Sequence, residues 1–483
     1  MDRIELSPSI IQEMGELFVR ELSQVAPELV RADLDGIEQG LQGLGRRVLG
    51  RVAEKTIAAI EAGQRKEAAC CPLCHQPMRL VDEARPRFLQ GLVGDYQLAR
   101  GYFYCERCPK GCAPLDERLG IGPGAFSPGL ARVACRLGIE KSFPEAADAL
   151  GEALHMTVID ESLRRITEGI GQVAEAEEQA AVARAKKGED PAGSGQGVPA
   201  TGMLAEGPAT GMLAVEVDGA LVHLEKAWHE AKVGVVSPLG PREEVDPDSG
   251  RVHLQLGSQS YCVGLEQAED FWYRVYAEAC RRGLGSLVVV LVVLLGDGAD
   301  WIWRYARQFV GIGQVQVVEI VDIFHAFEHL WTVANAVFGA GSAKAGEWVD
   351  PLKRQLEERG AGPILEALGQ LQAEDEGAAK EVRNALAYFT EHAARMDYPR
   401  FIALKSPIGS GAVEGACKVI LEEREKGTGM RWSGRGAQAV ATLRALHRSG
   451  RWRDFWQTHP QRRRPPVAPG RHPAVRPLQR QAA

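Results

Sequence analysis

Hydrophobic residues near the start of the chain recur every three or four positions, which is the period of an amphipathic helix. Ile10, Met14 and Leu17 belong to this series. A proline at position 27 should interrupt the series, because a proline inside a helix removes a backbone hydrogen bond. The pattern predicts two helices, separated near Pro27, in an N-terminal helical region at residues 1–66.

Strand-like and then helical patterns follow this region. Residues 67–118 contain cysteines, glycines and alternating aromatic positions that predict short strands. Helical spacing returns over residues 119–185, with a turn expected after Gly151. Residues 186–212 are rich in Gly, Ala and Pro and contain the first copy of a duplicated PATGMLA segment, so we expect a linker there.

The remaining pattern is typical of an α/β domain. Short apolar runs such as LAVEVDGALVHL and SLVVVLVVLLGD predict buried strands, and helical segments separate them. This domain is expected at residues 213–456, with an all-helical insert at about 326–400 where strand signals are lacking. The basic, Pro-rich tail at residues 457–483 is expected to be disordered. The predicted fold class is therefore multidomain α/β.

Composition narrows the range of functions. Of the 483 residues, 45% are hydrophobic and 25% are charged, which is ordinary for a globular protein. The net charge of −7 argues against a protein that coats nucleic acid through its overall charge, so DNA contacts would come from local basic patches. The first residues lack the pattern of a signal peptide, and the longest apolar run is far shorter than the roughly 20 residues of a membrane helix. We expect a cytoplasmic protein without a membrane partner.

Two of the predicted strands end in an Asp-Gly pair. Asp218 follows one apolar run and Asp297 follows another. A carboxylate at a strand end, next to a glycine that leaves space, can bind a metal ion. Glu414 falls in the first turns of a predicted helix. Oxygen ligands from three elements suit Mg²⁺ or Mn²⁺, although each residue alone is more typical of a turn or of a solvated helix.

Four cysteines form two Cys-x-x-Cys pairs with the spacing of zinc knuckles. They are Cys71, Cys74, Cys105 and Cys108. Thiolates at this spacing can bind one tetrahedral Zn²⁺ in a structural site. A long stretch separates the pairs, so a sizeable hairpin must lie between them. Cys70 and Cys112 flank the pairs and could replace a ligand in either one, and buried or redox-active cysteines are the alternative interpretation.

Two segments could bind DNA. A helix-turn-helix pattern at residues 142–171 would carry Arg164 and Arg165 toward a major groove on its second helix. After Glu414, basic residues interleave with tryptophans and glycines in a way that suits a DNA backbone. The predicted contact residues in that segment are Lys426, Arg431, Trp432 and Arg435. A helical hairpin that binds no DNA and an amphipathic helix with a solvated basic face are the respective alternatives.

Four blocks of the sequence resemble the ISKra-type transposases of bacterial insertion sequences. The blocks are VEVDGALVHLEKAWHEAKVGVV, LLGDGADWIWRYA, EIVDIFHAFEHLW and the segment that begins SGAVEGACKVILEEREKGTGMRW. The resemblance covers about residues 70–456. It implies a DDE transposase with a ribonuclease H-like catalytic domain and a helical insert. It also implies two catalytic Mg²⁺ or Mn²⁺ ions, held by the triad Asp218, Asp297 and Glu414.

The middle member of this triad has a competitor. Asp322 also ends a predicted strand, and with His325 it forms an Asp-x-x-His sequence that resembles a motif of related transposases. A helix cap at Asp322, with His325 packed in the first turn, explains the same residues without a metal. We expect Asp297 to be the ligand, with Asp322 and His325 as supporting residues.

Together these patterns predict an enzyme that cleaves DNA at insertion-sequence ends and transfers the freed strands into target DNA. The zinc module and the helix-turn-helix would find the ends, and a homo-oligomer bound to DNA in the bacterial nucleoid would pair them. Two alternatives stay open. One is a DNA-binding protein derived from a transposase whose catalytic domain is inactive, and the other is a nuclease that only hydrolyses DNA.

Overall fold

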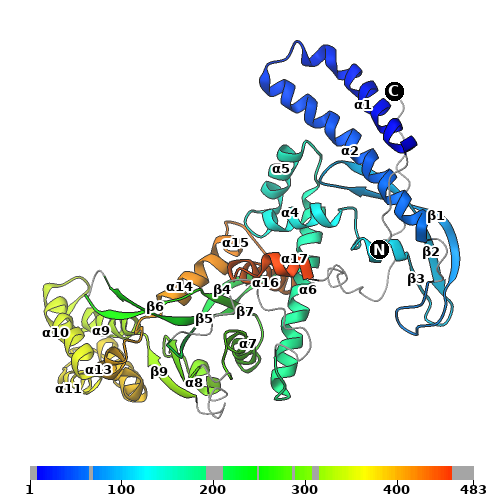
Figure 1. The fold of residues 1–483 in the computed structure, drawn as a ribbon. Coiled ribbons are helices and arrows are strands. Elements are labelled where there is room, and N and C mark those ends of the chain that lie inside the picture. The colour runs from blue at the N-terminus through cyan, green and yellow to red at the C-terminus, as the bar shows by residue number, and fades with distance from the viewer. Residues whose placement is uncertain are drawn as a thin grey trace. The chain divides into compact units, whose positions relative to one another are not determined.

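The computed structural model describes residues 8–64, 69–191, 210–246, 250–285, 289–306 and 315–458 (Figure 1). These residues divide into two compact units. The N-terminal unit contains residues 8–135 and 147–173, and the sheet unit contains residues 136–146 and 174–458. Most of the predicted linker and nearly all of the predicted tail lie outside the described residues. No helix among the described residues is long and apolar enough to cross a membrane.

The N-terminal unit combines helices with a small antiparallel sheet. Its helices are α1 (Pro8–Leu29), α2 (Leu34–Gln64), α3 (Pro114–Arg118), most of α4 (Pro128–Gly138) and of α5 (Phe143–Leu154), and the first part of α6 (Asp160–Lys186). Its sheet has the order β1 (Arg79–Gln90), β2 (Asp95–Cys105), β3 (Lys110–Cys112). Helix α1 continues through Pro27 to Leu29, so the break between the first two helices lies at residues 30–33 and not at the proline itself.

The sheet unit is built on a mixed sheet, which confirms the predicted α/β class. Its strands are β4 (Met212–Leu224), β5 (Ala227–Val245), β6 (Val252–Leu256), β7 (Ser260–Gly264), β8 (Leu291–Gly296) and β9 (Gln316–Val321). They are ordered β6-β5-β4-β8-β9, and β7 also pairs with β5. Strands β4 and β5 form an antiparallel hairpin, whereas β8 and β9 run parallel to β4.

Helices pack against this sheet. Between and after the strands lie α7 (Ala268–Arg281) and α8 (Asp300–Ala306), and then α9 (Ile323–Phe338), α10 (Ala343–Arg359), α11 (Gly362–Gln370), α12 (Glu376–Glu391), the 3₁₀ turn η2 (Ala393–Met396) and α13 (Tyr398–Ala403). Residues 323–403, all of which the structure describes, contain no strand. Helical secondary structure therefore fills the stretch where the sequence lacks a strand pattern.

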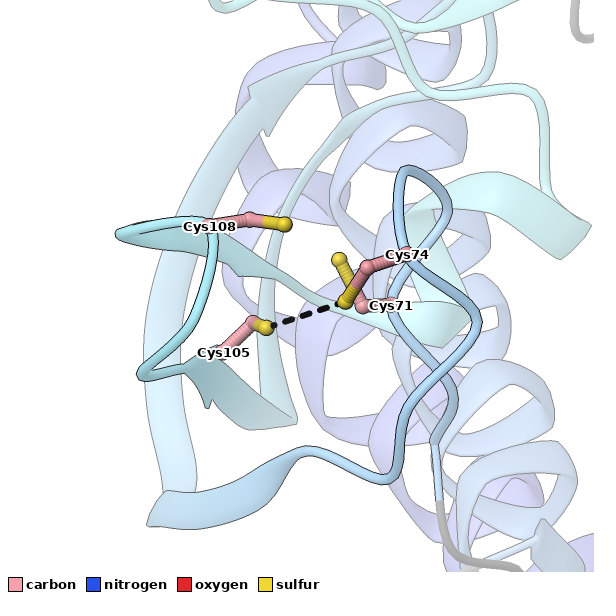
Figure 2. Close-up of side chains that lie close together, drawn as sticks. All are labelled: Cys71, Cys74, Cys105 and Cys108. Carbon is pink, nitrogen blue, oxygen red and sulfur yellow. Dashed lines mark hydrogen bonds between the residues drawn. The ribbon is translucent and has the colours of Figure 1, made fainter.

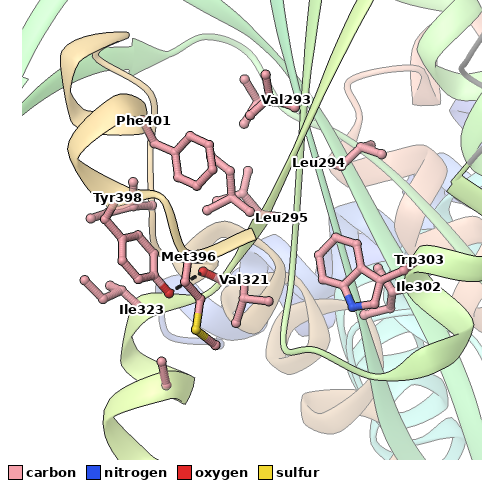
Figure 3. Close-up of a cluster of buried hydrophobic side chains, with 14 of the residues drawn as sticks. Val293, Leu294, Leu295, Ile302, Trp303, Val321, Ile323, Met396, Tyr398 and Phe401 are labelled. Carbon is pink, nitrogen blue, oxygen red and sulfur yellow. Dashed lines mark hydrogen bonds between the residues drawn. The ribbon is translucent and has the colours of Figure 1, made fainter. Parts of the chain in front are cut away.

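The apolar run of β8 forms the centre of the core. Leu295 lies with Phe401 of α13 on one side of the strand, while Leu294 lies with Trp303 of α8 on the other (Figure 3). All four side chains are at most 6% exposed. The hydroxyl of Tyr398 donates a hydrogen bond to the carbonyl of Val321 at 3.0 Å, which ties α13 to the end of β9. A strand buried on both faces reads as a continuous apolar run, as this one does.

The last helices contain one turn of π-helix. They are α14 (Gly411–Ala416), the π-helical η3 (Cys417–Glu422), α15 (Glu423–Glu425), α16 (Gly434–Arg448) and α17 (Trp452–Thr458). A π turn shifts the backbone hydrogen bonds by one residue. Arg444, 1% exposed, donates to the carbonyls of Val419 and Ile420 at 3.0 Å each. The buried guanidinium therefore pairs with π-turn carbonyls just after the helix that carries Glu414.

Alternation along β4 assigns its side chains to two different cores. Leu213, Val215 and Val217 belong to the core that contains β8 and the insert helices. Ala220 and Val222 belong to a second core with residues of α14, η3 and α16. Because strand side chains alternate between faces, the even-numbered residues of β4, including Asp218, face the helices that follow residue 411.

Candidate functional site

Asp218 occupies the face of β4 that packs against α14 and η3. Its Oδ1 accepts a hydrogen bond from the backbone N–H of Gly219 at 2.6 Å, and its Oδ2 accepts one from the thiol of Cys417 at 3.7 Å. Burial raises the pKa of Asp218, and the nearby negative charge of Asp297 raises it further. The carboxylate is therefore half-buried beside another acid, in the region where the sequence predicts a metal.

The sheet register aligns three aspartates at one edge. The parallel pairing of β4 with β8 matches Glu216 with Leu295, so two residues later Asp218 is level with Asp297. The pairing of β8 with β9 matches Gly296 with Val321, and the next residues are Asp297 and Asp322. Neighbouring strands lie about 4.8 Å apart. Both candidates for the middle carboxylate consequently stand at the same edge as Asp218.

The helical insert fixes the loop that carries Asp297. The Asp297 side chain accepts a hydrogen bond from the N–H of Ala299 at 2.9 Å, and its backbone carbonyl accepts one from the hydroxyl of Tyr388 at 3.1 Å. Gly298 has φ +105°, and a Cβ there would lie 2.8 Å from the Tyr388 ring, so glycine is required. Tyr388 stacks in turn on His329, with ring centroids 3.8 Å apart.

Asp322 is engaged in hydrogen bonds inside the protein. It is 1% exposed and caps α9 by accepting from the N–H of Phe324 at 2.7 Å. Its other oxygen accepts from the N–H of Ser410 at 3.1 Å and from the Ser410 hydroxyl. His325, on the first turn of α9, has its Nδ1 3.5 Å from the carboxylate of Glu328. This geometry is the helix cap that the sequence offers as the alternative role of Asp322.

Glu414 lies on the exposed side of α14. Partial burial and the negative charges of Asp322 and Asp218 raise the pKa of Glu414, whereas His325 lowers it. Glu414 is therefore close enough to these acids to sense their charge. The oxygens of Asp218, Asp297 and Glu414 do not all lie within 4.8 Å of one another; in the described part of the chain, only the cysteine group treated below meets that distance.

A fifth acid near this edge, Glu216, is absent from the residues predicted from sequence. Its side chain is 1% exposed and accepts a hydrogen bond from the N–H of Val413 at 3.0 Å. Burial, with added repulsion from Asp322 and Glu414, raises the pKa of Glu216 to about 8 although the Val413 hydrogen bond opposes the shift. The available signal was an acid inside an apolar run, two residues before Asp218 and so on the same face of the strand.

The four predicted cysteines form one compact group in the N-terminal unit. The Sγ atoms of Cys71, Cys74, Cys105 and Cys108 all lie within 4.8 Å of one another (Figure 2). Cys74 and Cys105 are 3.6 Å apart, and the predicted hairpin between the two pairs is formed by β1 and β2. Four thiols in this arrangement can bind zinc.

Backbone donors favour a thiolate in the first knuckle. The N–H groups of Cys74 and Leu73 lower the pKa of Cys71 to about 6. The flanking cysteines stand apart from the group of four, because Cys70 is exposed and Cys112 points its thiol at the sulfur of Met78, 3.6 Å away. The geometry thus groups the two Cys-x-x-Cys pairs and leaves out Cys70 and Cys112.

The predicted DNA-binding arginines of the helix-turn-helix are involved in ion pairs on their own helix. Arg164 contacts Glu161 and Glu168, each at 2.8 Å, and Arg165 contacts Glu161 at 2.7 Å. These residues lie on the first part of α6, and α5 precedes them after a short turn. The predicted pair of helices is present, but its arginines are already neutralised by acids one turn away.

The basic segment after Glu414 divides into exposed and buried residues. Arg431 and Arg435 are exposed, and Lys426 pairs with Glu422 at 2.6 Å. Trp432 is only 6% exposed, and its ring lies under the guanidinium of Arg424 at 4.8 Å. The prediction that Trp432 contacts DNA is therefore corrected, because its indole is part of the core.

Comparisons with known proteins leave the family unassigned. No protein-family model matches the sequence, and no curated protein matches it. Among solved structures, the Drosophila P element transposase strand transfer complex is similar at a TM-score of 0.22 and 9% sequence identity, over 69% of this chain and 83% of that chain. This TM-score is too low to establish a shared fold, so the resemblance to ISKra-type transposases stays a prediction from the sequence blocks.

Proposed function

We propose that this protein is a DNA transposase whose catalytic carboxylates are Asp218, Asp297 and Glu414. The observation that carries the proposal is their convergence. Three elements that are far apart in the sequence, β4, the end of β8 and α14, bring these residues to one edge of the sheet. They are the residues that the transposase-like sequence blocks single out independently.

The strand order supports a ribonuclease H-like catalytic domain. Strands β6 and β7 both pair with β5, and when they are taken together as the third strand, the order from β4 is third, second, first, fourth, fifth. Neighbours among the first three are antiparallel, and the last two run parallel to the first. This is the arrangement that the proposed family requires. It places β4 beside β8, so that Asp218, in the middle of β4, is level with Asp297, which directly follows β8.

The donor set fits divalent metal ions with a preference for oxygen. Carboxylates that raise one another's pKa lack a balancing cation, and Mg²⁺ or Mn²⁺ would supply that charge. When bound, two such ions would lower the pKa of an attacking water or 3′ hydroxyl and stabilise the leaving oxygen. Asp218 and Asp297 would hold them from the sheet and Glu414 from α14. The hydrogen bonds to Gly219 and Ala299 orient the two aspartates.

Binding of DNA is proposed for the exposed basic residues near Glu414. Arg431 and Arg435 follow the helix that carries this glutamate in the chain, and we propose that they contact the phosphate backbone of the DNA. Zinc in the four-cysteine group would have a structural role, because four thiolates leave no open position. We further propose a homo-oligomer on DNA, since two element ends must be joined together.

The test uses end-labelled DNA that carries the sequences flanking this coding region, incubated with the zinc-loaded full chain and Mg²⁺. Strand cleavage followed by joining to a second duplex is the expected result. Asp218→Ala should abolish both steps, while Asp300→Ala, an exposed acid nearby, should leave them intact. Cleavage without joining would identify a nuclease instead, and binding without cleavage would identify an inactive derivative.

A further inference from the structure

A buried carboxylate, Glu216, lies on the central strand two residues before Asp218. Residues two apart on a strand share a face, so both side chains face α14 and η3. Glu216 is 1% exposed, and its immediate neighbours Val215 and Val217 are buried and apolar. Burying a carboxylate is costly, and an apolar residue serves folding at least as well at such positions. The acid therefore calls for a role beyond filling the core.

The partner of Glu216 is the beginning of α14. Its Oε2 accepts a hydrogen bond from the N–H of Val413 at 3.0 Å, and Val413 is the third residue of this helix. The side chain of Val413 is fully buried beside it. Ser410, which precedes the helix, makes no side-chain cap, and its hydroxyl donates a hydrogen bond to Asp322. Glu216 thus provides an acceptor in the first turn of α14.

Two acids at the sheet edge therefore each accept a hydrogen bond from the start of α14. Asp322 binds Ser410, and Glu216 binds Val413, the residue directly before Glu414. The helix is only 6 residues long before it passes into the π turn at Cys417. These contacts therefore tie the start of the helix that carries Glu414 to β4 and to the end of β9.

We propose that Glu216 is a positioning residue of the carboxylate site, which anchors α14 to β4 and so fixes Glu414 relative to Asp218. This inference rests on the proposed function, because it assumes that Glu414 and Asp218 bind a divalent ion. It assigns to Glu216 no contact with that ion. Outer residues that orient metal ligands typically account for about 10- to 100-fold in metal affinity or activity.

Three substitutions separate positioning from simple stability. Glu216→Leu keeps the approximate size but removes the acceptor, and Glu216→Gln keeps an acceptor oxygen for Val413. Val222→Ala, on the same face of the same strand and fully buried, serves as the control for a destabilised core. For each zinc-loaded full chain, Mn²⁺ binding is measured by electron paramagnetic resonance of free Mn²⁺, and DNA cleavage is measured as a function of Mn²⁺ concentration.

Glu216→Leu should raise the Mn²⁺ concentration for half-saturation by about 10- to 100-fold, while Glu216→Gln and Val222→Ala stay near the wild type. The inference is overturned if Glu216→Leu binds Mn²⁺ like the wild type, or if Glu216→Gln is as weak as Glu216→Leu. If the wild type binds Mn²⁺ with this pattern of variants but cleaves no DNA, the proposed function fails while the positioning role stands. If the wild type binds no Mn²⁺, both fail.

Discussion

The carboxylate of Asp322 accepts two hydrogen bonds from Ser410, a residue that follows 88 positions later in the chain. One comes from the backbone N–H at 3.1 Å and the other from the hydroxyl. Together with the bond from Phe324, they make Asp322 a link between the end of β9 and the start of α14. Asp297, at the same edge, is instead level with Asp218 and carries its side chain on a loop.

This contrast predicts different consequences for the two aspartates. Asp322→Asn places an amide opposite the donors of Ser410, so the free energy of unfolding should fall by about 1–3 kcal/mol. Asp297→Asn should leave stability nearly unchanged. DNA cleavage by Asp297→Asn should fall by more than the roughly 100-fold expected for a supporting residue. Urea unfolding measures the stability, and single-turnover kinetics measure DNA cleavage. The assignment would be contradicted if the two variants had the same stability and lost the same amount of cleavage.

The sequence predicted both candidate acids and favoured Asp297 over Asp322, but it contains no local feature that separates their roles. Asp297 and Asp322 both follow an apolar strand, and the register shows why they look alike, since each ends a parallel strand at the same edge. What separates them is a contact with Ser410, which no local pattern contains. Glu216 was not among the predicted site residues for a related reason, because its hydrogen-bond partner Val413 lies on a helix almost two hundred residues later in the chain.

Local signals were sufficient for much of the fold. The two helices predicted near the start of the chain are α1 and α2, because their apolar positions recur every three or four residues. Burial overrode local character in the segment after Glu414. The tryptophan at position 432 sits among basic residues, yet Phe143, from a distant helix, meets its ring edge-on at a centroid distance of 5.9 Å. Packing between segments that are far apart in the chain leaves no signal in the residues next to Trp432 in the sequence.

Zinc should be present at about one ion per chain and should depend on the two Cys-x-x-Cys pairs. Cys74→Ser removes a ligand, so zinc content should fall and the N-terminal unit should lose protection from proteolysis. Cys112→Ser, in the same sheet but with its thiol directed at Met78, is the matched control and should keep the metal. Elemental analysis of the dialysed protein gives the answer; an equal loss of zinc in both variants contradicts the proposed ligand set.

The hydroxyl of Tyr388 should matter for catalysis through the Asp297 loop. Tyr388→Phe keeps the ring against Gly298 and His329 but removes the hydrogen bond to the Asp297 carbonyl, at a cost of about 1 kcal/mol. We expect a lower cleavage rate and a higher metal requirement. Tyr398→Phe is the control, because it deletes the comparable bond to Val321. A similar drop in cleavage for both variants would show that the effect is stability alone.

Arginines at positions 431 and 435 should contribute to DNA binding through charge. Each Arg→Ala change should weaken binding to all sequences alike and reduce the slope of log Kd against log salt by about one. Fluorescence anisotropy at several salt concentrations measures that slope. Arg383→Ala, an exposed arginine paired with Glu376 on the helical insert, is the control. Slopes that stay at the wild-type value in both variants would place the DNA elsewhere.

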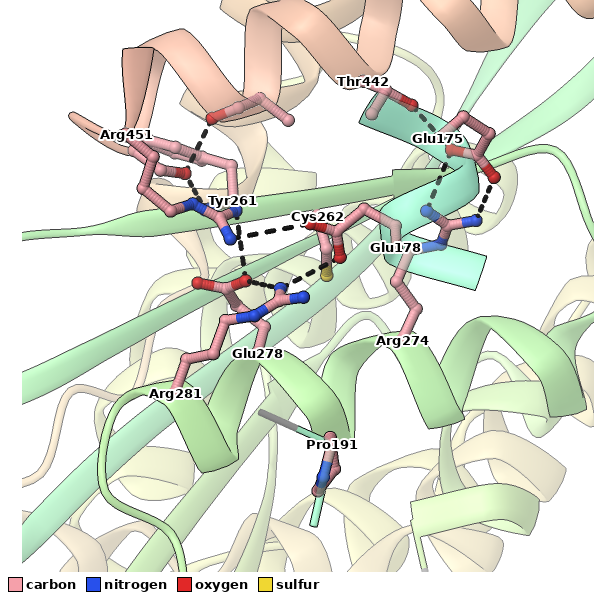
Figure 4. A network of polar contacts seen from close by, with 12 residues as sticks. Glu175, Glu178, Pro191, Tyr261, Cys262, Arg274, Glu278, Arg281, Thr442 and Arg451 are labelled. Carbon is pink, nitrogen blue, oxygen red and sulfur yellow. Dashed lines mark hydrogen bonds and ion pairs between the residues drawn. The ribbon is translucent and has the colours of Figure 1, made fainter. Parts of the chain in front are cut away.

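Acid should destabilise the sheet unit through a buried ion-pair network between α6, α7 and the residues after α16 (Figure 4). Glu278 is 1% exposed and contacts Arg281 at 2.7 Å and Arg451 at 3.2 Å. Burial alone would raise the pKa of Glu278, but the two arginines outweigh it and lower the pKa from an ordinary 4.5 to about 2. A carboxylate with a lowered pKa contributes stability above about pH 4.5, and this contribution is lost as the pH falls toward 2.

All nine tryptophans lie in the sheet unit, so their fluorescence follows its unfolding separately. At pH 7, Glu278→Gln should lower the free energy of unfolding by about 3–5 kcal/mol, because it leaves buried arginines without their partner. Between pH 5 and pH 3 the wild type should lose more stability than this variant, since the variant has no carboxylate to protonate at that position. Glu376→Gln, which changes an exposed pair, should follow the wild type at every pH. Parallel curves for the wild type and Glu278→Gln would mean that protonation of Glu278 does not drive the acid sensitivity.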